Sequence, residues 1–106
     1  MMNMESVNAH EIEQERQGLA RQLTGESGEE WVEENRPGSV GCHELLDRTA
    51  LVADMLARHI LTHPACISRP EWYLLAEQAA AALRALYQNV GTEHLAVDGP
   101  DADSSE

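Results

Sequence analysis

Two groups of residues in this chain have types and spacings that could support chemistry. In the first group, His59 and His63 lie four residues apart, and Cys66 follows three residues later. Imidazoles at this spacing share one helix face, and a nearby thiolate could join them in holding a metal ion. No carboxylate completes the ligand set, and the helix lacks the glutamate of a zinc hydrolase. His59, His63 and Cys66 are therefore weak metal candidates. The simpler interpretation is that the histidines extend an apolar stripe, and we expect no metal and no cofactor.

The second group would form only if two helices pack antiparallel. Cys42, His43 and Glu44 would then approach Glu93 and His94. A Cys–His pair can act as a nucleophile when a third group orients the base inside a pocket. A two-helix hairpin offers no such pocket, so we expect Glu44 and His94 to cap helix ends and expect no enzymatic activity.

The elements that would position these groups are two amphipathic helices. Apolar residues recur at alternating spacings of four and three along 44–63 and again along 72–90. This periodicity predicts helices at about 42–63 and 69–91. Because only residues 64–67 connect them, they should form an antiparallel hairpin, and the fold class is all-α.

The ends of these helices also have sequence signals. The pair His63-Pro64 should end the first helix, because a residue before proline is driven out of the α region. Ser68 and Glu71 have the spacing of a capping box, which would begin the second helix. Gly91 is a natural stop for that helix.

The two cysteines are predicted to remain free thiols. A helix over residues 42–63 is about 30 Å long, at ~1.5 Å per residue, which would separate Cys42 from Cys66. A disulfide requires α-carbons within about 7 Å of each other.

Charge divides the chain into three parts. The net charge of −12 is distributed as −6 over residues 1–41, −1 over residues 42–91 and −5 over residues 92–106. The nearly neutral middle part should be the folded hairpin, with an acidic N-terminal arm before it and an acidic disordered tail after it.

The N-terminal arm contains a weaker helical pattern. Asn8 offers a cap, and Ile12, Leu19 and Leu23 could line one side of a helix over about 8–24. Gly18 lies inside this segment and weakens the pattern.

Composition excludes several classes of function. The chain has no lysine and no basic cluster, so it should bind neither nucleic acid nor an anionic membrane surface. No segment approaches the ~20 apolar residues that a membrane span requires. We therefore expect a soluble, cytoplasmic protein.

The apolar stripes of the two helices are wider than one neighbour can cover. We expect a second copy to complete a four-helix bundle, which makes the protein a homodimer; the alternative is that the 8–24 helix folds back over the hairpin. The residues expected at this interface are Leu45, Val52, Leu56, Ile60, Trp72, Leu75, Leu83 and Leu86.

A run of glutamates in the N-terminal arm is the expected contact surface for a basic protein. Its members are Glu26, Glu29, Glu30, Glu33 and Glu34. The sequence thus favours a small non-enzymatic protein–protein interaction module that regulates or inhibits a basic partner, in a salt-sensitive association. The alternatives are a metal- or thiol-dependent activity at His59, His63 and Cys66, and an acidic mimic of nucleic acid that occupies a basic groove.

Overall fold

The computed structural model describes the backbone of residues 8–104 and the side chains of residues 8–96. The chain divides into two units, Met1–Glu34 and Asn35–Glu106, which are described separately. Within residues 8–104 every regular element is a helix, which confirms the all-α fold class. The expectations for residues 1–7 of the arm and 105–106 of the tail lie outside the described residues.

The first unit begins with the helix that the sequence predicted in the arm. Helix α1 spans Ala9–Ser27, and its N-cap is Asn8. The Asn8 side chain accepts hydrogen bonds from the backbone N–H groups of His10 and Glu11. These bonds satisfy donors that have no partner inside the helix, so the predicted cap is confirmed.

A short second helix, α2 (Glu30–Glu34), follows α1. Gly28 ends α1 with φ of 78°, a left-handed conformation that glycine adopts without strain. Trp31 Nε1 then donates to Thr24 Oγ1 at 3.0 Å, which links α2 to the last turns of α1.

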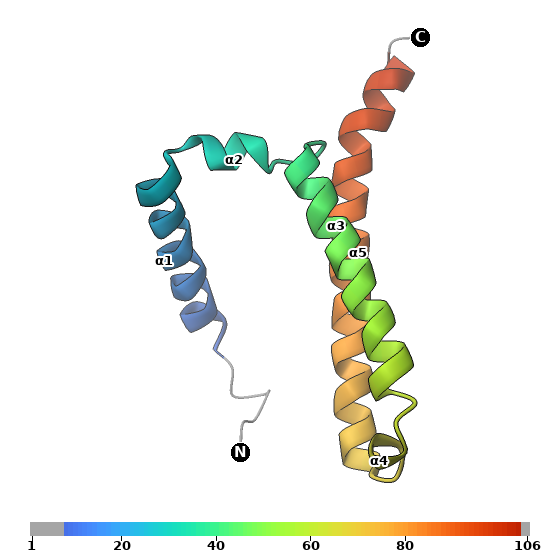
Figure 1. The fold of residues 1–106 in the computed structure, drawn as a ribbon. Coiled ribbons are helices and arrows are strands. Elements are labelled where there is room, and N and C mark those ends of the chain that lie inside the picture. Colours follow the sequence, from blue (N-terminus) through green and yellow to red (C-terminus); the bar gives the residue numbers. More distant parts are fainter. Residues whose placement is uncertain (1–7, 105–106) are drawn as a thin grey trace. The chain divides into compact units, whose positions relative to one another are not determined.

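The second unit contains the predicted hairpin. Helix α3 (Val40–Met55) continues into a π-helical segment, η2 (Leu56–Ile60), and after the short helix α4 (Pro64–Ile67) the chain returns as α5 (Pro70–Ser104). Figure 1 shows α3 and α5 lying side by side, with α4 at the closed end.

Small side chains form the seam between the two long helices. Cys42 and Thr49 of α3 and Ala80 of α5 are buried. Gly91 lies against Leu46, because a Cβ atom built on Gly91 would be 3.6 Å from Leu46 Cδ1. Small residues let the helix backbones approach closely, but they bury little apolar area, so most large apolar side chains remain on the hairpin's surface.

The closed end differs from the simple loop that the sequence predicted. In η2 the Leu61 N–H reaches back to the Leu56 carbonyl at 3.0 Å, which is the five-residue step of a π-helix. His63 leaves the helical region at ψ 131°, as a residue before proline should, and its Nδ1 accepts from Ala65 N–H at 3.0 Å. His63 therefore caps α4, a helix that hydrophobic periodicity does not reveal.

Ser68 does not form the predicted capping box. Its hydroxyl donates to the Ala65 carbonyl at 2.8 Å, so Ser68 serves the end of α4 and not the start of α5. At the start of α5 the Arg69 guanidinium lies 5.0 Å from the centre of the Trp72 ring. This cation–π contact packs the connection against the first turn of the helix.

The expected stop at Gly91 is wrong, because α5 continues to Ser104. Gly91 faces Leu46 of α3, and His94 beyond it accepts a hydrogen bond from the Gly38 backbone N–H. Tertiary contacts therefore offset the low helix propensity of glycine. The backbone of residues 92–104 is helical, where the charge pattern predicted a tail without regular structure.

Both cysteines are buried and free, as predicted from the length of the helix between them. Among the described residues no helix is both long enough and apolar enough to cross a membrane.

Candidate interaction surface

One side of the hairpin carries two rows of mostly apolar side chains, which include His59 and are interrupted on α3 by Arg48, and we call this side the apolar flank. On α5 the row recurs at spacings of three or four residues, and on α3 and η2 a matching row lies beside it. The members of the apolar flank are Leu45, Val52, Met55, Leu56, His59 and Ile60 from α3 and η2, and Trp72, Leu75, Ala79, Leu83, Leu86 and Val90 from α5.

A groove of about 370 Å³ runs between the helices along this flank. Its walls contain no charged residue, and His59 is their one polar side chain. The residues that line it are Val52, Met55, Leu56, His59, Ile60, Ala79 and Leu83. A second hollow, of about 340 Å³, continues toward the closed end and shares His59 and Ile60 with the first. The groove is suited to the apolar side chains of another helix.

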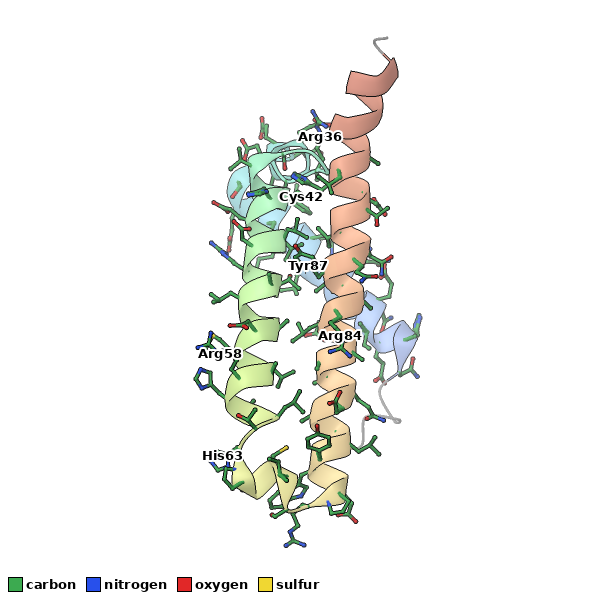
Figure 2. The ribbon with its side chains drawn as sticks, turned by 90° about the vertical axis from the view of Figure 1, so that its right-hand side faces the viewer. Arg36, Cys42, Arg58, His63, Arg84 and Tyr87 are labelled. Carbon is green, nitrogen blue, oxygen red and sulfur yellow. The ribbon has the colours of Figure 1, made fainter. Side chains whose placement is uncertain are left out.

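The opposite flank of the hairpin is more polar. There a smaller hollow of about 250 Å³ is lined by Ala50, Ala53, Arg84, Tyr87 and Gln88. Figure 2 labels Arg84 and Tyr87 on α5. The two flanks therefore differ in chemistry, and the apolar one alone resembles an unpaired helix–helix interface.

The residues expected at an interface fall into two groups by solvent exposure. Leu56 and Leu83 are half-buried in the groove wall. The other six are 43–50% exposed, namely Leu45, Val52, Ile60, Trp72, Leu75 and Leu86. The interface residues predicted from the sequence did not include Met55 and Ala79, which also line the groove. Met55 lies three residues after Val52 and four before His59, so the same spacing rule could have found it.

The weak metal candidates lie around the second hollow. His59, His63 and Cys66 all line it, together with Trp72. Among the described residues, however, no three His, Cys, Asp or Glu side chains are arranged to hold a metal ion. His63 Nδ1 already accepts from the Ala65 N–H as the N-cap of α4.

At the open end, the structure brings His43 and His94 together. Their ring centroids lie 5.6 Å apart, and His43 Nε2 lies 3.5 Å from Asp47 Oδ2. Cys42 lies on α3 at this end (Figure 2). The sequence predicted that these segments meet, but it assigned the capping roles wrongly.

Ser39, and not Glu44, caps α3: its Oγ accepts from Cys42 N–H at 3.1 Å. His94 lies inside α5, is only 6% exposed, and its Nδ1 accepts from Gly38 N–H at 2.8 Å. The accepting nitrogen must carry a lone pair, so this bond requires the neutral ring with its proton on Nε2. His94 thus ties the residues before α3 to α5.

The acidic contact residues lie in the first unit. Glu26 is in the last turn of α1 and accepts from Gln22 Nε2 at 3.2 Å. Glu30, Glu33 and Glu34 belong to α2, and all the predicted acidic residues, including Glu29, are exposed. The run of carboxylates is therefore carried largely by helices, where the sequence alone had left its order doubtful.

Glu13 on α1 has the strongest pKa shift among the described groups. Hydrogen bonds from Arg16 and from Gln17 lower the pKa of this carboxyl from 4.5 to about 2. Arg16 Nε donates to Glu13 Oε1 at 2.8 Å. Because the folded pKa is lowered, the contribution of this pair to α1 is present above pH 4.5 and is lost as pH falls toward about 2.

We expect a carbon-detected NMR titration of the Glu13 carboxyl to give a midpoint near 2. Replacing Arg16 by Gln should move this midpoint back toward 4.5, because the leading donor is removed. Arg21→Gln, on the same helix, is the control and should leave the midpoint unchanged. A wild-type midpoint near 4.5 would show that the pair does not form in solution.

Comparison of this chain with protein-family models, with curated proteins and with solved structures gives no match. The function must therefore be argued from the geometry of the hairpin.

Proposed function

We propose that this chain is a non-enzymatic, cytoplasmic protein–protein interaction module, and that the apolar flank of its hairpin is the docking surface. The observation that carries the proposal is the groove between α3 and α5, whose lining contains no charge. Burying the exposed half of one such side chain stabilises a complex by roughly 1 kcal/mol. Six of the expected interface residues are about half-exposed, so their combined burial is a substantial driving force.

The acidic residues of α1 and α2 give the module a second contact surface, for a basic protein. Their exposure and their position on helices support this role. We propose that the module regulates or inhibits such a partner, with the hairpin as the scaffold. The nucleic-acid mimic and the metal- or thiol-dependent activity remain alternatives, and no specific contact among the described residues favours either.

The test is photo-crosslinking from two adjacent positions of α5. Leu75 belongs to the apolar flank and Leu74 does not, yet the two are similarly exposed, at 47% and 57%. Benzoylphenylalanine at position 75 should give a protein adduct in the cell, and the same group at position 74 should not. Equal yields at both positions, or no adduct at either, would contradict docking on this flank.

The same experiment tests the acidic surface. Benzoylphenylalanine at Val32, in α2, should crosslink a basic protein, and the yield should fall when salt is added to the extract. The yield from position 75 should change little, because apolar burial is not screened by salt. A salt-independent yield from position 32 would remove the basic partner from the proposal.

A further inference from the structure

We infer that the occupant of the apolar flank is a second copy of this chain, related to the first by a two-fold axis. The inference rests on the proposed function and names the partner of the same surface. A flank that presents a groove beside a row of side chains can receive its own copy, because each row fills the other's groove.

The apolar row on α5 is uninterrupted, which favours a second copy. From Trp72 to Val90 the members of the row follow one another at spacings of three or four residues and are all apolar, and Ala79 at the centre permits close approach. The row thus runs along α5 for several turns without a charge. A surface of this length and chemistry is typical of the interfaces of homodimeric helical bundles.

The positions of two charged residues also favour a second copy. The one charged residue in the α3 row is Arg48, between Leu45 and Val52, and the α5 row ends at Glu93. Leu46 lies beside Gly91, and in an antiparallel hairpin Arg48 and Glu93 then lie two residues to either side of that contact, about 6 Å apart along the axis at ~1.5 Å per residue. If a two-fold axis parallel to the helices places α3 against the α5 helix of the second copy, Arg48 comes within reach of Glu93 of the partner subunit.

The charge on α1 disfavours this helix as the occupant. Its apolar side chains Ile12, Leu19 and Leu23 share one stripe, but Arg16 lies on that stripe between the first two. Arg16 is paired with Glu13 in an exposed ion pair. Seating α1 in the groove would carry this charge into walls that offer it no charged or hydrogen-bonding partner apart from His59. The second copy also brings a charge, Arg48, but it offers Glu93 as a partner for that charge.

The experiment is sedimentation equilibrium on the full chain and on two matched variants. We expect the wild type to have twice the 11.7 kDa mass of one chain. Leu75→Glu should raise the dissociation constant at least tenfold, because it buries a charge at the interface. Leu74→Glu should leave the dissociation constant unchanged, and far-UV circular dichroism should show that both variants stay helical.

Each result decides between the inference and its alternatives. A monomeric wild type, or equal effects of the two variants, overturns the second copy. An adduct from position 75 with a different protein also overturns it but leaves docking on the flank intact, whereas an adduct within the chain to residues 9–27 overturns both the second copy and docking on the flank. If position 75 gives no adduct and the wild type is monomeric, the proposed function fails as well.

Discussion

Replacing Ala80 by Leu should destabilise the hairpin by about 1–3 kcal/mol, as is usual when side-chain volume is forced into a packed seam. Ala80 is the most buried of the α5 residues whose side chains are described, at 3% exposed, and α5 packs against both α3 and η2. A leucine there would push the two helices apart, and the seam is made of small residues that cannot move aside. Helix propensity cannot cause the loss, since leucine is nearly as good a helix former as alanine.

Urea unfolding followed by circular dichroism measures this effect, at a fixed protein concentration because association would shift the midpoint. Ala81→Leu is the matched control, since Ala81 is the next residue of the same helix and is exposed. Its free energy of unfolding should change by less than about 0.5 kcal/mol. Similar midpoints for the two variants would mean that α3 and α5 do not pack through Ala80.

Replacing His94 by Leu should cost about 1–3 kcal/mol, because the part-buried Gly38 N–H would lose its acceptor. The substitution should also remove protection of the Gly38 amide from hydrogen exchange, while amides in the middle of α3 stay protected. This local readout separates the loss of one bond from general unfolding.

His94→Asn tests the role of the accepting atom. The Asn oxygen can occupy the position of Nδ1 and accept from Gly38, so this variant should retain most of the protection at Gly38. If His94→Leu leaves the exchange of Gly38 unchanged, the bond does not hold the open end together.

The sequence alone was sufficient for the parts of this protein that depend on neighbouring residues. The spacing of apolar residues along 44–63 and 72–90 gave both helices, Asn8 gave the start of α1, and His63-Pro64 gave the break between the two arms of the hairpin. These signals work because helix periodicity, capping and the restriction before proline all act within a few residues.

Local signals failed where distant segments compete for the same group. Gly91 was predicted to end α5, but the helix continues beyond it. Gly91 contacts Leu46, and His94 accepts a hydrogen bond from Gly38, which lies 56 residues earlier in the sequence. Ser68 had the spacing of an N-cap, yet its hydroxyl bonds to Ala65 in a short helix that periodicity could not detect.

The candidate docking surface shows the same division. Composition and spacing determined that the hairpin would carry more apolar surface than its two helices can bury on each other. Only the packing of α3 against α5 decided that Met55 and Ala79 would line the groove, which puts Leu75, one turn before Ala79, on that flank and Leu74 off it. Side chains that are adjacent in a helix differ by about 100° in direction, and the sense in which two helices pack selects which direction faces the seam.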